Sequence, residues 1–331
     1  MTTTPWVRRN KALSAALLSA ALVLTGCGSD DKDTGSTAAP AATTRTITAG
    51  NGTVTIPADP QRVVALGNTS QPFIDIGGKP IGVTELSASE LDPIPADQKA
   101  TYEAATRLGA DTAEIDLEKL AGLKPDLILV QVPDAEFEGI KKQLETIAPT
   151  VFWGLDTEWK AFADALAEAG NLTDSLSTQK VAFQGKVAKI KETYPQIIAD
   201  TKFVAVDRWD NSDPGTFVIT DFGCIEIAAD DIGLNSPKAA AGADPLGWAD
   251  LPFEQIAGLS KYDAILYPVD AAGQPKKAFA TVTESNTWKA LPTVTSGRAL
   301  GVFCPGNNSY GPVLQYLDSL DTALASLAAK E

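Results

Sequence analysis

Polar and aromatic side chains follow several short apolar runs of the chain at the point where each run ends. Gln131 and Trp153 each close such a run. Arg208 and Trp209 follow another, and Asn68 follows the first. If the runs are strands of open α/β sheets, these side chains meet in a crevice, because ligands bind there outside the carboxyl ends of the strands. Aromatic faces stack on flat ligands and arginine offers a fork of donors, so the pattern predicts non-covalent capture of a small molecule.

Each of these side chains also has a purely structural interpretation. Trp153 could pack in a core, and Asn68 could shape its loop. Arg208 could form a surface salt bridge with Asp207 or Asp210. The residue types alone leave both interpretations open.

Two weaker candidates lie in loops that contain glycine. Arg107 precedes Gly109 in the first half of the chain, and Tyr310 follows the last apolar run. Both side chains can donate hydrogen bonds to a ligand. We include both among the predicted ligand contacts.

The composition excludes most catalytic chemistry. The chain has no histidine, so it cannot form a Ser-His-Asp triad, a Cys-His pair or nearly any catalytic zinc site. No Gly-x-Gly-x-x-Gly or phosphate-loop motif follows a predicted strand, which argues against a nucleotide-dependent enzyme. Cysteines and acids do not cluster at metal-ligand spacing. We therefore expect neither an enzyme nor a resident cofactor or metal.

The charge balance is strongly acidic. The formal net charge is −15, and the first 26 residues contain Arg8, Arg9 and Lys11 but no acid. Removing that segment takes away three positive charges and leaves −18. A surface of this charge repels nucleic acid and keeps a protein soluble, and we expect a monomer.

The N-terminus has the organisation of a bacterial lipoprotein leader. Positive residues precede an apolar run, Ala12–Leu24, that is too short to span a bilayer comfortably. The run ends in Leu24-Thr25-Gly26-Cys27, which resembles a lipobox and implies cleavage before Cys27 and lipidation of its sulfur. An ordinary signal peptide with an incidental cysteine is the alternative. Residues 1–26 are then a leader and 27–44 a flexible tether, which anchors the protein outside the cytoplasmic membrane.

Two further cysteines remain after Cys27. Cys224 and Cys304 form an even pair in an oxidising compartment, which favours a disulfide. Two separate buried thiols are the alternative.

The rest of the chain alternates strands and helices in two halves. Strands are predicted at 62–66, 80–83, 126–131 and 150–153, and again at 202–207, 216–220, 263–269 and 299–303. The stretch between them, 157–194, has only helical spacing. The alternation predicts an α/β fold with mostly parallel sheets, in a lobe at 45–168 and a lobe at 197–331. A long helix at 169–196 would join the lobes, with a ligand cleft between them.

The two halves also resemble each other in sequence. Three pairs of segments match in the same order: 117–129 with 253–266, 149–151 with 292–294, and 75–77 with 231–233. Glu118 and Glu254 hold the same place in the first pair. The matches predict two pseudo-equivalent lobes.

Several segments together resemble the iron–siderophore and cobalamin branch of the periplasmic binding proteins. They are Ala58–Leu66, Ile115–Leu129, Trp288–Val294 and the pair Gly297-Arg298. The resemblance covers about residues 45 to 331. It implies two Rossmann-like lobes joined by one long helix, with little closure on binding. It also implies delivery of the ligand to an ABC permease dimer with its ATPase.

The resemblance implies roles for individual residues. Glu118 and Glu254 would each pair with arginines of one permease subunit, although each could merely favour a helix N-terminus through the dipole. Trp248 would line the cleft, unless it is wedged beneath a loop. Gln131 matches a position that contacts ligand in the family.

The expected ligand is a ferric siderophore. Catecholate siderophores are anionic, so an acidic protein needs local cations to hold one, and Arg208 is the main candidate. Cobalamin stays open because it needs mainly aromatic walls. Haem is disfavoured because the chain has no histidine to ligate its iron. A surface receptor without a transport role is the remaining alternative.

Overall fold

The computed structural model describes residues 43–91, 93–111, 114–209, 212–220, 224–236, 248–306 and 309–330. The predicted leader, the lipidation site Cys27 and nearly all of the predicted tether lie outside these residues. Across the described ranges, no helix has both the length and the apolar character needed to cross a membrane.

The first lobe is built on a five-stranded sheet in the order β5-β4-β3-β6-β7. Its strands are β3 (Val63–Gly67), β4 (Gly82–Val83), β5 (Thr106–Arg107), β6 (Leu127–Gln131) and β7 (Thr150–Trp153). Every pairing is parallel, so all five strands end on one edge. Every residue of β6 and β7 is buried, as expected of a parallel sheet covered on both faces.

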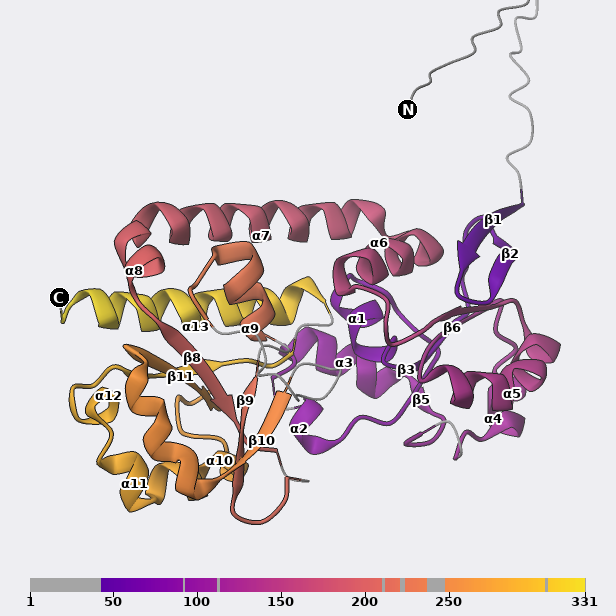
Figure 1. The fold of residues 1–331 in the computed structure, drawn as a ribbon. Helices are drawn as coiled ribbons and strands as arrows, with labels where there is room; N and C mark the ends of the chain where they lie inside the picture. The colour runs from indigo at the N-terminus through magenta and orange to yellow at the C-terminus, as the bar shows by residue number, and fades with distance from the viewer. Residues whose placement is uncertain are drawn as a thin grey trace, which may run out of the picture. The chain divides into compact units, whose positions relative to one another are not determined.

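The helices of the first lobe alternate with these strands (Figure 1). They are α1 (Ser70–Asp75), α2 (Ala88–Leu91), α3 (Ala96–Ala104), α4 (Leu117–Gly122) and α5 (Asp134–Ile147).

A β-hairpin that the sequence did not predict precedes this sheet. Strand β1 (Thr44–Ala49) pairs antiparallel with β2 (Gly52–Pro57). Gly50 N in its turn donates to Phe152 O over 2.8 Å, and the Asn51 side chain bonds Phe152 N and Thr150 O. Because β7 is the last strand of the sheet, the hairpin pairs backbone groups that would otherwise form an open edge.

The second lobe carries a five-stranded sheet in the order β10-β9-β8-β11-β12. Strands β8 (Phe203–Asp207), β11 (Ala264–Val269) and β12 (Ala299–Phe303) are parallel. Strand β9 (Thr216–Thr220) runs antiparallel to both of its neighbours, β8 and β10 (Trp248–Pro252). The shorter helices are α9 (Cys224–Glu226), the π-helical turn η1 (Ile227–Ile232), the 3-10 helix η2 (Phe253–Lys261), α10 (Lys277–Glu284), α11 (Asn286–Lys289) and α12 (Pro292–Thr295).

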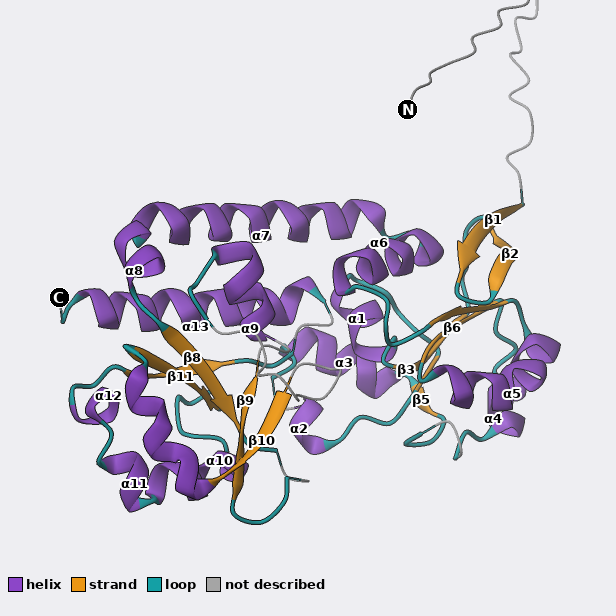
Figure 2. Ribbon diagram, in the orientation of Figure 1, coloured by secondary structure: helices purple, strands orange, loops and turns teal. Residues whose placement is uncertain are grey.

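Long helices connect the two lobes. The chain passes from the first lobe through α6 (Trp159–Gly170) and α7 (Thr173–Thr193) to α8 (Pro195–Asp200). The last helix, α13 (Tyr310–Ala328), lies beside α7 (Figure 2). Ion pairs Lys186–Asp318 and Lys189–Asp321 link the two helices. The predicted two-lobed α/β fold is therefore confirmed.

One hydrophobic cluster extends through both lobes and the helices that join them. It contains Phe73 of α1, Leu166 of α6, Phe183 of α7 and Leu317 of α13, together with Phe203 of β8. The lobes thus share a core. Displacing one lobe relative to the other would expose apolar surface, which opposes large movements.

The lobes match each other in topology as well as in sequence. Strands β6 and β11 hold the same position in their sheets, and α4 and η2 precede them. The Asp126 carboxylate accepts hydrogen bonds from Gln61 N and Arg62 N over 2.8 and 2.9 Å. Asp263 accepts one from Lys202 N over 2.9 Å, and so makes the equivalent link in the second lobe.

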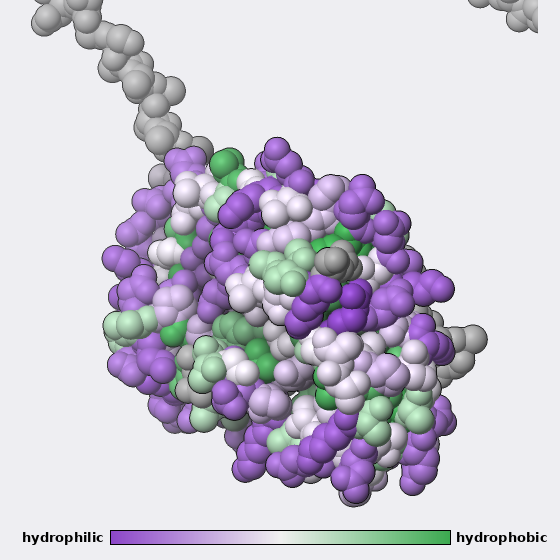
Figure 3. Space-filling model, turned by 90° about the vertical axis from the view of Figure 1, so that its left-hand side faces the viewer, coloured by the Kyte–Doolittle hydropathy of each residue, from purple (hydrophilic) through white to green (hydrophobic). Residues whose placement is uncertain are grey.

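The face of the molecule in Figure 3 is mostly hydrophilic. Apolar residues occur on it in small separate groups, as is ordinary for a protein surface. This face therefore gives no indication of an extended apolar docking surface.

Candidate functional site

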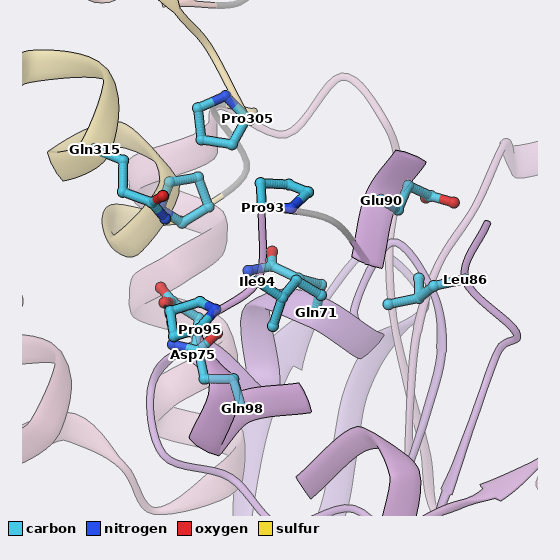
Figure 4. A pocket seen from close by; sticks show the side chains of 11 residues that line it. Gln71, Asp75, Leu86, Glu90, Pro93, Ile94, Pro95, Gln98, Pro305 and Gln315 are labelled. Carbon is cyan, nitrogen blue, oxygen red and sulfur yellow. Dashed lines mark hydrogen bonds between the residues drawn. The ribbon is translucent and has the colours of Figure 1, made fainter. Parts of the chain in front are cut away.

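A small pocket of about 70 Å³ lies where the two lobes meet (Figure 4). It has room for a few water molecules, so it can hold one arm of a ligand and not a whole metal chelate. Lobe 1 contributes α1, α2, α3 and nearby loop residues, and lobe 2 contributes the loop after β12 and the start of α13. The lining residues are Gln71, Asp75, Leu86, Glu90, Pro93, Ile94, Pro95, Gln98, Pro305, Pro312 and Gln315.

Prolines form much of this interlobe pocket. Pro93 and Pro95 flank Ile94 ahead of α3, Pro305 follows β12, and Pro312 lies in the first turn of α13. The ring of each proline fixes its own φ, so these walls have little backbone freedom. A wall that is already ordered loses less entropy when a ligand binds.

Asp75, the last residue of α1, is the polar centre of the lobe junction. It is only 7% exposed. Its Oδ2 accepts a hydrogen bond from Gly311 N of α13 over 2.9 Å, and its Oδ1 accepts one from Gln98 Nε2 of α3 over 3.0 Å. Gln179 Nε2 of α7 donates to the Asp75 carbonyl over 2.9 Å. Asp75 thus connects four helices and both lobes.

The approach of Asp75 to α13 depends on a glycine. A Cβ built on Gly311 would lie 1.9 Å from Asp75 Oδ1, far inside contact distance. Ser309, the residue before α13, makes no side-chain cap to the helix. Asp75 therefore caps α13 from the opposite lobe, where the helix N-terminus also favours its negative charge.

Gln131 and Asn68 lie together at the carboxyl edge of the first sheet. Asn68 N donates to Gln131 O over 2.9 Å, and the Asn68 side chain is exposed. Gln131 is 6% exposed, and its Nε2 donates to Gly154 O over 3.4 Å. The strand ends thus bring these two predicted residues together, with the Asn68 side chain open to solvent.

Two predicted aromatic contacts lie in the core instead. Trp153 is 4% exposed and packs edge-on against Phe162, with 5.5 Å between ring centroids. Tyr310 is 2% exposed and lies 4.9 Å from the ring of Trp159 and 5.5 Å from that of Phe183. Burial raises the pKa of Tyr310 to about 12, and nearby carboxylates act in the same direction. Packing accounts for the position of both rings, and a contact of either with a ligand stays a prediction.

The two predicted arginines are engaged by backbone carbonyls. Arg107 Nη1 donates to Glu103 O and Ala105 O over 2.8 and 2.7 Å. Arg208 donates from Nε to Thr216 O over 3.0 Å and from Nη1 to Ala278 O over 3.1 Å. Part of each guanidinium is thus engaged in holding chain segments together. The role of Arg208 in binding an anionic ligand stays a prediction.

The remaining predicted aromatics are adjacent to strands of the second lobe. Trp209 is half-buried beyond the end of β8. Its side chain forms a hydrogen bond with Asp207. Burial raises the pKa of Asp207, and the positive charge of Lys276 partly offsets that rise. Trp248 is the first residue of β10, opposite Thr220; its side chain lies outside the described part of the structure, so its place in the cleft stays a prediction.

A wider groove of about 460 Å³ lies along α7 on the outside of the molecule. Its three lysines are already engaged. Lys160 forms an ion pair with Asp231 over 2.7 Å, Lys180 pairs with Asp164 over 2.8 Å, and Lys191 donates to the Asp231 carbonyl over 3.1 Å. The groove lies on a helix surface and not at the strand ends, so we regard the interlobe pocket as the candidate site.

A profile of the periplasmic binding protein family matches residues 78–300, which is more than half of the chain. The chain belongs to the periplasmic binding protein family. This family and its structural neighbours are substrate-binding proteins, which agrees with a pocket between two lobes.

Relatives of this periplasmic binding protein share its length. A probable siderophore-binding lipoprotein of Bacillus subtilis is 28% identical over 304 residues, covering 88% of this chain and 90% of the relative. An iron(3+)-hydroxamate-binding protein of the same organism is 28% identical and covers 87% and 89%. The siderophore periplasmic binding protein from the fuscachelin gene cluster of Thermobifida fusca aligns with a TM-score of 0.70 at 28% identity, over 82% of this chain and 98% of that one.

Cys224 and Cys304 of this periplasmic binding protein form a disulfide, with Cα atoms 5.9 Å apart. The bond joins the start of α9 to the residue after β12. It therefore fixes the start of the loop that carries Pro305 into the interlobe pocket. Among the described residues, no cluster of three or more histidine, cysteine or acidic side chains is placed to hold a metal ion.

Glu118 and Glu254 occupy equivalent exposed positions. Each is the second residue of its helix, α4 or η2, and each side chain is open to solvent. Asp116 caps α4 by accepting a hydrogen bond from Lys119 N over 2.9 Å, so Glu118 is not needed for that purpose. The permease-docking role of both glutamates stays a prediction.

Sequence reasoning missed four polar residues that line the interlobe pocket: Gln71, Asp75, Gln98 and Gln315. Asp75 entered only as part of a matched segment between the halves. A charged residue inside the apolar run Phe73-Ile74-Asp75-Ile76 was a usable signal, because carboxylates are seldom buried without partners. The three glutamines carry no comparable signal in the sequence.

Proposed function

We propose that this periplasmic binding protein captures a ferric siderophore between its lobes and delivers it to an ABC importer. The interlobe pocket carries the proposal, because it opens between two α/β lobes of a chain in this family. The siderophore-binding and iron-hydroxamate-binding relatives support it, since each is matched over nearly its whole length. The rest of the chelate would lie over the strand ends, against Asn68 and Trp209.

We also propose how the protein works at the cell surface. Cys27 carries the lipid, and the tether at 27–44 holds the lobes outside the cytoplasmic membrane. Glu118 and Glu254 would each meet one subunit of the permease, because one carboxylate on each lobe suits a partner of twofold symmetry. In this proposal the protein binds and transfers its ligand without changing it chemically.

Isothermal titration of the mature chain tests the ligand. The panel is a ferric tris-hydroxamate, a ferric tris-catecholate, ferric citrate, cyanocobalamin and haemin. We expect at least one ferric siderophore to bind with a micromolar or tighter Kd. Tight binding of cyanocobalamin with no response to any ferric siderophore would move the assignment to cobalamin.

A matched pair of variants tests the location. Gln315→Phe places a ring in the interlobe pocket, whereas Thr322→Phe places the same ring on an exposed part of the same helix. We expect Gln315→Phe to weaken binding by about tenfold or more, which corresponds to about 1.4 kcal/mol. Thr322→Phe should bind like the wild type. Equal affinities of the two variants would place the ligand elsewhere.

A further inference from the structure

The carboxyl edge of the lobe 1 sheet is acidic. Glu85 and Glu90 follow β4, Asp134 follows β6, and Asp156 follows β7. A Cβ built on Gly154 would lie 2.8 Å from a carboxylate oxygen of both Asp134 and Asp156, so these two carboxylates converge at the strand ends. The ion pairs found among the described residues include none of these four acids.

Arg107, the last residue of β5, is the nearest arginine of this sheet to the acidic edge. Its guanidinium donates to Glu103 O and Ala105 O, which both precede the strand, and lies 4.7 Å from the ring centroid of Tyr102. The Tyr102 hydroxyl accepts a hydrogen bond from Leu86 N, beside Glu85. Arg107 is thus one cation, engaged by backbone carbonyls, against four acids.

Among the second-lobe cations that follow strands, Lys277 is exposed at the start of α10, whereas two others are already engaged. Arg208 is directed to the carbonyls of Thr216 and Ala278, and Lys276 acts on the carboxyl group of Asp207. The residues that line the interlobe pocket include Asp75 and Glu90 and, within the described part of the chain, neither a lysine nor an arginine. The protein is also acidic as a whole, at −15.

The charge of a ferric chelate depends on its ligand groups. Iron(III) carries three positive charges, and each bidentate hydroxamate carries one negative charge, so a tris-hydroxamate complex is neutral. A free amine on such a chelator makes the complex cationic. Each catecholate carries two negative charges, so a tris-catecholate complex is strongly anionic, and like charges brought together across an interface cost several kcal/mol.

We propose that the cleft selects neutral or cationic ferric chelates of the hydroxamate type, with an ammonium arm, where one is present, directed toward the acidic edge of lobe 1. This inference rests on the proposed function, because it names the ligand class of the same site. It also reverses the sequence-based expectation of an anionic catecholate held by Arg208. Selection then works by repulsion of anions as well as by attraction of cations.

A charge series on one chelator tests the inference. The ferric complex of desferrioxamine B carries a free ammonium, its N-acetyl derivative is neutral, and its N-succinyl derivative is anionic. All three share the same iron–hydroxamate core. We expect the mature chain to bind them in the order cationic, neutral, anionic, with about a threefold loss at each step. A ferric tris-catecholate should bind at least about a hundredfold more weakly than the cationic complex.

Variants identify the source of the preference. The double variant Glu85→Gln/Glu90→Gln removes two exposed charges from the acidic edge and should at least halve the ratio between cationic and succinylated complexes. Glu145→Gln, an exposed residue in the last turn of α5, makes the same chemical change elsewhere and should leave the ratio unaltered. Added salt should also reduce the ratio, because it screens exposed charges.

The possible failures are distinguishable. Equal affinities across the series, or tightest binding of the catecholate or succinylated complex, would overturn the inference and leave the proposed function standing. Binding of no ferric chelate would overturn both. An unchanged ratio in the Glu85→Gln/Glu90→Gln variant would show that the acidic edge is not the cause, which also overturns the inference.

Discussion

At the scale of single residues, Asp75 has an unusual position. It is a buried carboxylate whose partners are amides, namely the Gly311 backbone and the side chains of Gln98 and Gln179. The contact between Asp75 and Gly311 spans 236 positions of the chain. Local patterns cannot reveal such a pair, which is why the sequence predicted residues at strand ends, such as Gln131, but not this junction.

The Asp75→Asn variant tests the junction. An asparagine turns one acceptor oxygen into a donor NH₂ group, which would face the N–H of Gly311 or Gln98. We expect the free energy of unfolding to fall by about 1–3 kcal/mol, the usual cost of an unsatisfied buried group. Urea denaturation measures it. Asp164→Asn, which removes an exposed ion pair with Lys180, should cost at most about 1 kcal/mol. If Asp164→Asn lost more unfolding free energy than Asp75→Asn, the role of Asp75 at the lobe junction would be contradicted.

Glu226 provides a test of pH dependence. Burial raises its pKa, as do the neighbouring carboxylates Asp230 and Glu158, while Lys160 lowers it. Because the pKa in the folded state lies above the unfolded value, Glu226 favours folding only while it is protonated. That contribution is complete below the unfolded pKa and is lost as the pH rises through the folded pKa.

We therefore expect Glu226→Gln to unfold at a higher temperature than the wild type near pH 7. The difference should shrink as the pH falls toward about 4, near the ordinary pKa of glutamate. Thermal unfolding followed by circular dichroism across this range makes the comparison. A stabilisation that is constant with pH would show that ionisation of Glu226 is not its cause.

At the scale of elements, periodicity located the parallel strands that are continuous apolar runs, and it missed the two-residue strand β5. Strand β7 begins and ends at the predicted residues, and β6 differs by one residue at its start. The antiparallel direction of β9 could not be read this way, since pairing depends on neighbours that are distant in sequence, and β10 was not predicted as a strand. The β1–β2 hairpin was missed because its strands are rich in threonine and only partly buried.

The disulfide is the element-scale feature that is easiest to test. Cys224 and Cys304 are 80 positions apart, and closing so long a loop restricts the unfolded chain. We expect the double variant Cys224→Ser/Cys304→Ser to lose about 2–4 kcal/mol of unfolding free energy. Intact-mass measurement of the wild type, alkylated under denaturing conditions without reductant, should show neither thiol modified. Alkylation at both positions would refute the bond.

At the scale of the whole molecule, the alternation of strands and helices and the resemblance to a family both predicted two lobes joined by one long helix. The fold confirms the two lobes, which α6, α7 and α8 connect. The resemblance did not supply the polar lining of the interlobe pocket, where Gln71 and Asp75 of α1 meet Gln315 of α13. Pocket linings depend on side chains brought together by packing, and they differ between relatives that share a fold.

One double variant should impair iron uptake without impairing ligand binding. The Glu118→Lys/Glu254→Lys double reversal leaves the interlobe pocket untouched, because both side chains are exposed on α4 and η2. We expect ligand affinity to stay within about twofold of the wild type and iron uptake by cells to fall strongly. Cells with Glu118→Ala or Glu254→Ala should take up iron more slowly than the wild type and faster than the double reversal. Normal uptake by the double reversal would leave these glutamates with only a helix-dipole role.

The position of iron in the ligand-bound protein shows whether the ferric chelate is held between the lobes. Crystals of the mature chain with a ferric tris-hydroxamate would be measured at the iron absorption edge, where the metal gives its own anomalous peak. The account predicts one strong peak between the lobes, with the chelate against Gln71, Pro305 and Gln315. A peak on the outer groove beside α7, or no peak at saturating ligand, would contradict it.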